Sequence, residues 1–215
     1  MIIISLGGSV IVPHNINIEF LEAFKKVITA SKEKFIIVVG GGKTCRTYQD
    51  AAKDASPEDL DWIGIAATHL NAQLLRSVFG KATYEKIITD PTKKAATQKI
   101  LIAAGWKPGW STDTDAVHFA KTYGAKTIIN MTNVDYLYEQ NPNEHPNAKK
   151  LTKASWSQLK KIVGTVWKPG LNRPFDPVAT KLAAQLKVKL IIIGPDIKNL
   201  ENVLANKSFR GTVIS

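Results

Sequence analysis

Short apolar runs alternate with longer segments of helical periodicity along the whole chain of 215 residues. Most of these runs lack a regular polar alternation, which is typical of strands buried on both faces of a sheet. Because helical segments separate the runs, the pattern predicts an α/β fold, a three-layer αβα sandwich around a mostly parallel central sheet. The runs expected as strands are 1–6, 34–42, 85–89, 99–104, 126–134, 188–194 and 211–215.

The segments between the runs carry helix signals. Between 16 and 31, apolar residues recur at three- and four-residue spacing, which indicates one face of a helix. In the next long segment Ser56 can cap a helix, Pro57 suits its first position, and Gly80 is placed to end it after Phe79. Further helices are expected at 43–55, within 105–125, at 155–163, within 167–187 and at 196–206.

Length and charge limit the classes of function. A chain of 215 residues fits a single domain, 1–215, or two closely packed lobes. The net charge of +11 favours a phosphorylated or polyanionic ligand, but only four of the 29 basic residues are arginine, and the lysines are scattered. Because arginine dominates the recognition of base edges and phosphates, we expect no nucleic-acid partner.

The sequence also predicts a cytoplasmic protein without a membrane partner. No apolar run approaches the roughly 18 residues that a membrane span needs. Met1 leads into an apolar run without the basic segment of a secretory signal, and the single cysteine, Cys45, suits a reducing compartment.

Two glycine-rich loops follow the first two predicted strands, "LGGS" at 6–9 and "GGGKTCR" at 40–46. Glycines let backbone N–H groups approach an anion closely, and the start of the following helix favours negative charge there. Lys43 and Arg46 lie in the first turn of that helix, in reach of the same anion. The second loop is not a Walker A motif, because Ile37 stands where that motif needs a glycine. One such loop is equally consistent with a tight packing turn, but two favour a phosphate site.

Two later loops also carry polar groups. The loop 106–116 combines two tryptophans, a lysine and two hydroxyl residues that can cap the next helix. Asp113 and Asp115 in it could hold Mg²⁺ through water, or be ordinary helix-start and surface carboxylates. The loop 132–142 is rich in side chains that can hydrogen-bond a base or a ribose, and a polar hairpin is the alternative.

Other candidates give weaker signals. Cys45 lies at a predicted helix start, which could lower its pKa, but a small buried residue is the favoured interpretation. Asp59 and Asp61 fit the preference for negative charge in a first helical turn. No zinc site is expected, because the histidines lack metal-ligand spacing; they are His14, His69, His118 and His145.

Taken in order, these loops resemble the amino acid kinase family and, within it, the archaeal-type uridylate kinases. The resemblance covers essentially the whole chain and includes "SLGGSVIVP", "VVGGGKTCRTY", "DLDWIGIAATHLNA", "WKPGWSTDTDA", "TNVDYLYEQNP", "FDPVATKLA" and "FRGTVIS". It implies transfer of the γ-phosphoryl group of ATP to UMP with Mg²⁺, in pyrimidine nucleotide biosynthesis, by a homohexamer. It also implies an N-terminal lobe, 1–123, on the acceptor side and a C-terminal lobe, 124–215, on the ATP side.

The resemblance carries site roles to matching positions. It implies an ATP site at Ser5, Leu6, Gly7, Gly8, Ser9, Gly42, Arg46, Thr132, Tyr138 and Asn141. It implies a UMP site at Gly41, Asp61, Trp106, Lys107, Pro108, Gly109, Trp110, Ser111 and Thr112. The expected catalytic cations are Lys43, Arg46 and Lys181, and no protein ligand to a metal is assigned.

The chain departs from the family pattern at three positions. Ser5 stands where many members have lysine, Tyr136 replaces a usual glycine and Asn141 a common aspartate. Two other functions therefore stay open. One is another phosphate kinase of the family, such as isopentenyl phosphate kinase, although the loop "GGGKTCRTY" lacks that branch's histidine. The other is a non-catalytic nucleotide-binding or storage relative.

Overall fold

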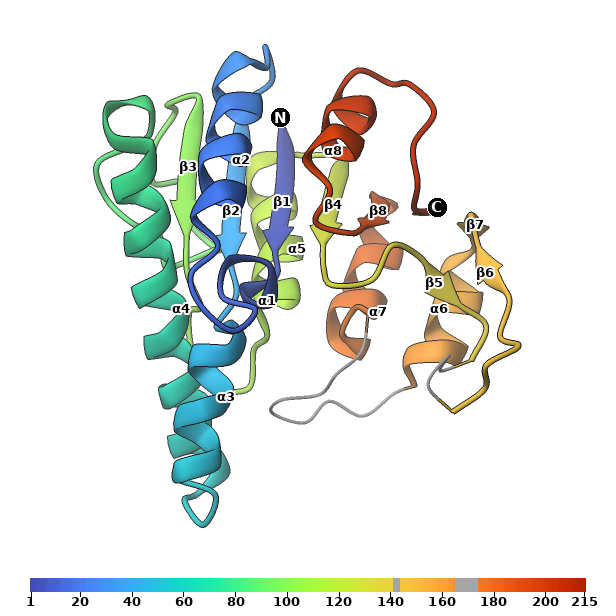
Figure 1. The fold of residues 1–215 in the computed structure, drawn as a ribbon, viewed down its shortest axis with the longest axis horizontal. Helices are drawn as coiled ribbons and strands as arrows, with labels where there is room; N and C mark the ends of the chain where they lie inside the picture. The colour runs from blue at the N-terminus through green and yellow to red at the C-terminus, as the bar shows by residue number, and fades with distance from the viewer. Residues whose placement is uncertain (141–143, 165–173) are drawn as a thin grey trace.

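A mostly parallel sheet forms the centre of the protein (Figure 1). The computed structural model describes residues 1–140, 144–164 and 174–215. Five strands of this sheet run parallel, a sixth is antiparallel to its neighbour, and the last pairs in parallel with the sixth. In sheet order the described strands are β3 (Ile100–Ala103), β2 (Phe35–Val39), β1 (Ile2–Leu6), β4 (Thr127–Met131), β8 (Lys189–Ile193), β9 (Thr212–Ile214) and β7 (Lys153–Ala154).

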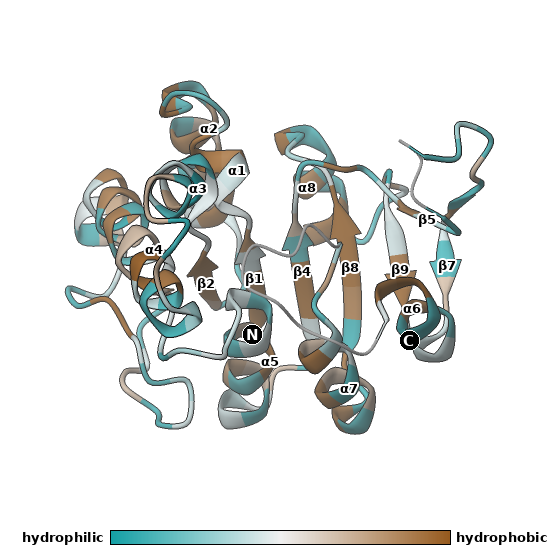
Figure 2. Ribbon diagram, turned by 90° about the horizontal axis from the view of Figure 1, so that it is seen from below, coloured by the Kyte–Doolittle hydropathy of each residue, from teal (hydrophilic) through white to brown (hydrophobic). Residues whose placement is uncertain are grey.

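Helices cover both faces of the sheet, as Figure 2 shows edge-on, so the predicted three-layer αβα fold is confirmed. One layer holds α1 (Gly8–Ile11), α2 (Ile18–Ala30), α3 (Gly42–Ala51), α4 (Pro57–Phe79) and α8 (Ile197–Leu204). The other holds α5 (Thr112–Tyr123), α6 (Trp156–Val163) and α7 (Pro177–Leu186). A 3₁₀ turn, η1 (Gly80–Ala82), and a small ribbon of β5 (Leu137–Tyr138) and β6 (Lys150–Leu151) complete the described elements.

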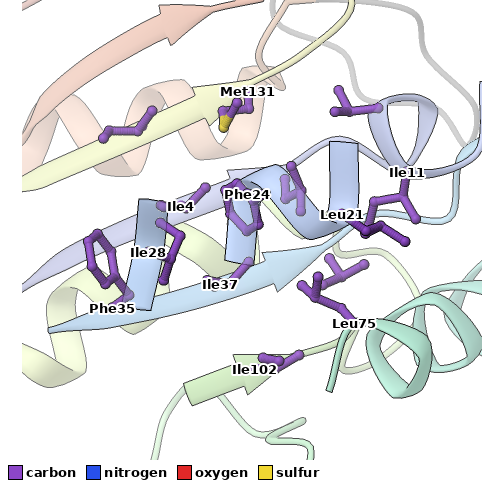
Figure 3. Packing of buried hydrophobic residues seen from close by; sticks show 14 of the residues in the cluster. Ile4, Ile11, Leu21, Phe24, Ile28, Phe35, Ile37, Leu75, Ile102 and Met131 are labelled. Atoms are coloured by element: carbon purple, nitrogen blue, oxygen red, sulfur yellow. The ribbon is translucent and has the colours of Figure 1, made fainter. Parts of the chain in front are cut away.

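The core consists of two apolar clusters, one on each face of the sheet. Neighbouring residues of one strand point to opposite faces, so Ile3 joins one cluster and Ile4 the other. Figure 3 shows the second of these faces, where Phe24 and Ile28 of α2 pack over Ile37 of β2. This two-sided burial explains why the strand sequences are continuously apolar.

The helix signals of the sequence were reliable for the longest helix. Ser56 caps α4 by accepting a hydrogen bond from the Asp59 N–H, and Pro57 is the first helical residue. Gly80 follows the last helical residue with a positive φ of 57°, a conformation that suits glycine. These local contacts fix where α4 begins and ends.

The strand predicted at 85–89 is wrong. Only Ile88 pairs there, as an isolated parallel bridge to Ala103 beside β3. Glu85 and Lys86 are exposed, and this charged pair leaves the edge of the sheet instead of pairing along it. The sequence patterns also missed the short elements α1, β5, β6 and β7, which are too short to show a period.

We predict that the two ends of one turn of α2 differ sharply in their contribution to stability. Leu21 is 2% exposed in the core, whereas Ile18 is 64% exposed despite sharing the apolar spacing. Leu21→Ala should lower the free energy of unfolding by about 2–5 kcal/mol, because it leaves a cavity. Ile18→Ala, the matched control, should change it by no more than about 0.5 kcal/mol. Urea denaturation of both variants measures the difference, and equal losses would contradict the described packing.

Candidate active site

A cavity of about 540 Å³ lies at the carboxyl ends of the parallel strands. The loops that follow β1, β2, β3 and β4 all contribute to its wall, together with the starts of α3, α5 and α7. In Figure 1 these strand ends lie at the lower edge of the sheet, where α1 and α3 begin. Ligands of open α/β sheets bind at this edge, so the cavity is the candidate site.

The two glycine loops touch each other at the cavity. A Cβ atom added at Gly8 would lie 2.1 Å from the Gly42 nitrogen, and one added at Gly42 would lie 2.3 Å from the Gly8 oxygen. Gly42 also has a φ of +64°. Side chains at these two positions would push the loops apart, so the contact requires glycine on both sides.

This contact collects backbone donors on one side of the cavity. Among the residues that the structure describes, the N–H groups of Gly8, Ser9, Gly41 and Gly42 donate no hydrogen bond. All four residues line the cavity. Free N–H groups at the start of a helix bind phosphates readily, so the wall is suited to a phosphorylated ligand.

Arg46 is the only cationic side chain among the described residues that line the cavity. It lies in the first turns of α3, and its Nη2 donates to Ser9 Oγ at 3.3 Å, which joins the two loops. Lys43 and Lys181, the other two predicted catalytic cations, are exposed and outside the lining. Lys43 precedes Arg46 by three residues and so projects from the same side of α3, but only Arg46 reaches the cavity lining.

The structure brings most of the predicted nucleotide-site residues into the cavity wall. Leu6 is different: its side chain is 0% exposed in the hydrophobic core, because the last residue of β1 points away from the loops. Asn141 lies outside the described residues. The predicted residues in the lining are Ser5, Gly7, Gly8, Ser9, Gly41, Gly42, Arg46, Asp61, Trp110, Ser111, Thr112 and Thr132. Those outside the lining are Leu6, Trp106, Lys107, Pro108, Gly109 and Tyr138, besides the two lysines.

Ser5 is hydrogen-bonded to a carboxylate at the floor of the cavity. Its Oγ donates to Asp113 Oδ1 at 2.9 Å, and the backbone N–H of Asp176 donates to Asp113 Oδ2 at 3.2 Å. Asp113 thus joins β1 to the starts of α5 and α7. Burial, followed by the nearby charge of Asp176, raises the pKa of Asp113 to about 7.

Asp176 extends this network into α7. Its Oδ1 accepts hydrogen bonds from the N–H groups of Val178 and Ala179, which caps the helix. Its other oxygen accepts from the hydroxyls of Thr114, at 2.8 Å, and Ser111. The sequence analysis did not single out Asp176, although an aspartate before a proline is a helix-start signal.

Asp115 is neither a surface carboxylate nor part of the cavity wall. It is 0% exposed, and the Trp106 N–H donates to its Oδ2 at 3.2 Å. Its Oδ1 has no hydrogen-bond partner among the described residues. Burial is the main cause that raises the pKa of Asp115 to about 8, so this acid is mostly protonated at neutral pH.

The loop after β3 is anchored to α4. The Gly105 N–H donates to Thr68 Oγ1 at 2.8 Å, and the Gly109 N–H donates to Asp61 Oδ2 at 2.7 Å. Asp61 itself lines the cavity. Asp61, the residue predicted to bind the ribose of UMP, therefore also anchors the loop after β3.

Two tryptophans and a lysine form a stack on this loop. The rings of Trp106 and Trp110 meet edge to face with centroids 4.9 Å apart, and Lys107 Nζ lies 4.1 Å from the Trp106 centroid. The Trp110 ring also lies against His118, with centroids 4.2 Å apart. Of these four residues only Trp110 lines the cavity. Trp106, Lys107 and His118 pack against its ring outside the lining.

Cys45 lies near the start of α3. The favoured interpretation was a small buried residue, whereas the structure leaves Cys45 half-buried in the cavity lining. Burial raises the pKa of its thiol. Within the described ranges, no group of three or more histidine, cysteine, aspartate or glutamate side chains could hold a metal ion. Nor does any helix in these ranges have the length and apolar character to cross a membrane.

Comparison with known proteins assigns the family. Residues 1–194 match the amino acid kinase family. The chain belongs to the amino acid kinase family. The uridylate kinase of Pyrococcus abyssi is 35% identical over 99% of this chain and 98% of its own length. The uridylate kinase of Methanospirillum hungatei is 34% identical over 100% of this chain and 94% of its own.

Solved structures of amino acid kinases agree with this assignment. The crystal structure of uridylate kinase from Archaeoglobus fulgidus superimposes with a TM-score of 0.83 at 31% identity and covers 100% of this chain and 99% of that one. The UMP kinase of Ureaplasma parvum has a TM-score of 0.80, covers 100% of this chain and 97% of that one, and shares 19% of its residues, a likeness of fold.

We predict that Asp115 makes the protein less stable as the pH rises from 3.8 to about 8. The pKa values of Asp113 and Asp115 are raised from 3.8 to about 7 and about 8, so the folded chain holds protons that the unfolded chain releases. Their contribution to stability is fully present below pH 3.8 and is lost as the pH rises towards about 8.

Asp115→Asn keeps an oxygen for the Trp106 N–H and has no proton to lose. Its unfolding free energy should therefore fall less than that of the wild type between about pH 5 and pH 9. Urea unfolding at a series of pH values measures both slopes. Parallel curves for the two proteins would show that Asp115 is ionised in the folded state.

Proposed function

We propose that the protein is a UMP kinase, which transfers the γ-phosphoryl group of ATP to UMP and yields UDP and ADP. One observation carries the proposal: both glycine loops, Arg46 and the loop after β3 face a single cavity. That arrangement gathers phosphate-binding backbone donors and a cation around one cavity, which suits the transfer of a phosphoryl group between two bound nucleotides. The names of the full-length relatives support the same activity.

Positioning and charge neutralisation are the main contributions that such a reaction needs from the protein. An oxygen of the UMP phosphate attacks the γ-phosphorus, and the bond from that phosphorus to the bridging oxygen breaks, so the electron pair leaves with ADP. The nucleophile is already an anion, which removes the need for a general base. Glycine N–H groups and Arg46 stabilise the charge on the phosphoryl oxygens.

We assign the acceptor to the N-terminal lobe, 1–123, and ATP to the C-terminal lobe, 124–215. Asp61 and Trp110 line the cavity on the acceptor side, where a ribose hydroxyl and a base would meet them. Thr132 and Asn133, after β4, line the opposite side. We also propose, from the family resemblance, that the enzyme is a cytoplasmic homohexamer of pyrimidine biosynthesis.

Mg²⁺ fits this site as an ion carried mainly by the nucleotide. The carboxylates in the lining near the glycine loops are Asp113 and Asp176, and both already accept hydrogen bonds on both oxygens. Mg²⁺ commonly keeps several waters and binds through substrate phosphates with few protein ligands. When bound, it would neutralise phosphate charge beside these carboxylates.

The cavity wall argues against isopentenyl phosphate as the acceptor. An isoprenoid tail needs an apolar channel, whereas the described lining consists mostly of glycine, hydroxyl, amide and acid residues. Apolar side chains are few, and they include Ile65, Trp110 and Pro174. No histidine lies among the described lining residues.

A product assay tests the proposed function. We expect UDP to form from UMP, ATP and Mg²⁺ well above the diphosphates formed from CMP, GMP and AMP. Isopentenyl phosphate is included as a further acceptor. A chain that forms no nucleoside diphosphate, although it binds ATP in calorimetry, would be the non-catalytic relative instead.

We predict that Arg46 is the most important of the three candidate cations. Arg46→Ala should lower kcat by about 10²-fold or more, as for the loss of one electrostatic stabiliser of the transition state. Lys43→Ala and Lys181→Ala should have smaller effects, because both side chains lie outside the cavity lining. Steady-state kinetics of the three variants compares them. A larger loss in Lys181→Ala would mean that this lysine reaches the phosphates when nucleotides bind.

A further inference from the structure

A buried amide lies directly behind the second glycine loop. Asn71, in the middle of α4, is 3% exposed. It belongs to neither the predicted ATP site nor the predicted UMP site. Its Nδ2 donates to the carbonyl oxygen of Gly40 at 2.9 Å and to that of Gly41 at 3.0 Å. Both partners are acceptors, so the side-chain nitrogen must face them. No other described side chain hydrogen-bonds these two carbonyls.

These two bonds help to set the direction of two consecutive peptide groups. The Gly41 carbonyl also accepts from the Cys45 N–H at 3.2 Å, whereas the Gly40 carbonyl has no other hydrogen-bond partner among the described residues. The described peptide bonds are all trans, so the N–H of each peptide points opposite to its C=O. A Gly40 carbonyl turned towards Asn71 therefore turns the Gly41 N–H away from Asn71, and the Gly41 carbonyl does the same for the Gly42 N–H. All three glycines line the cavity and Asn71 does not.

We propose that Asn71 is a positioning residue that orients the Gly41 and Gly42 N–H groups towards the transferred phosphoryl group. Without a Cβ, a Gly-Gly-Gly segment has a wide choice of backbone conformations, and a rotated peptide would present a carbonyl oxygen to the phosphate. Asn71 selects the productive orientation from behind the loop. This proposal rests on the phosphoryl-transfer function proposed above.

The surroundings of Asn71 favour this role over a purely structural one. The buried face of α4 around it contains Ala72, Leu75 and Phe79, all in the apolar core. An apolar residue could fill such a position, and a buried amide is tolerated only because both of its N–H groups are bonded. The two acceptors are loop carbonyls at the cavity, so the fold of α4 itself does not need the amide.

The test compares Asn71→Leu with Leu75→Val. The first variant keeps the branched shape of the side chain at a somewhat larger volume and removes both donors. The second lowers core packing one turn further along α4, away from either glycine loop. We expect Asn71→Leu to lower kcat by about 10²-fold, in the range for a lost donor to a transition-state oxyanion. Its KM for UMP and for ATP should change little, because the loss falls on the transition state.

Leu75→Val should lower the Tm and leave kcat unchanged. If Asn71→Leu does not fold, Asn71→Ala replaces it, because alanine leaves a small cavity and cannot overfill the site. The same loss of kcat is expected for Asn71→Ala. A folded Asn71 variant with the wild-type kcat would overturn the proposal. So would a variant whose only change is a lower Tm, because that is the signature of a structural residue.

A second readout separates this proposal from the proposed function. Inorganic pyrophosphate is titrated into ¹⁵N-labelled wild type and Asn71→Leu, and the amide signals of Gly41 and Gly42 are followed by NMR. We expect these two signals to shift in the wild type and to respond at least several-fold more weakly in the variant. A wild type that makes no UDP but shows this difference refutes the kinase function and keeps the role of Asn71. Equal responses in both proteins refute the role of Asn71.

Discussion

The rest of the site depends on the contact between two glycine loops. Parallel pairing places Leu6 of β1 level with Val39 of β2 and Met131 of β4, so the loops that follow start at the same height. They can then share one cavity only if Gly8 and Gly42 approach without side chains. The result is a set of backbone donors whose positions are set by the sheet, which is the preorganisation that phosphoryl transfer needs.

Side chains behind the loops maintain this geometry, and they do so with buried polar groups. Asn71 holds the second glycine loop, and Asp113 joins Ser5 to the starts of α5 and α7. Asp115 remains buried beneath the loop after β3, with one oxygen that has no partner among the described residues. Such groups cost stability unless they are fully bonded, and sites that must hold a defined geometry retain them. In this chain the serine at position 5 takes part in that network, and Arg46 supplies the charge from α3.

Much of the fold and part of the site could be predicted from the sequence. The family assignment came from the order of the loops and is confirmed. The caps of α4 were predicted because a cap involves residues only three or four positions apart. The strand at 85–89 was wrong, because whether an edge segment pairs depends on what lies beside it. Leu6 was placed in a nucleotide site by its position in a motif, whereas its side chain belongs to the core.

The sequence by itself determined the longer strands of the sheet, most helices, the glycines of both loops and the family. These follow from periodicity, capping and motif order, which are properties of neighbouring residues. Only the tertiary structure decided that Arg46 faces the cavity, that Asn71 holds Gly40 and that Ser5 bonds Asp113. The last two contacts join residues 31 and 108 positions apart. Such contacts depend on how each helix is rotated against the sheet, and no local pattern records that rotation.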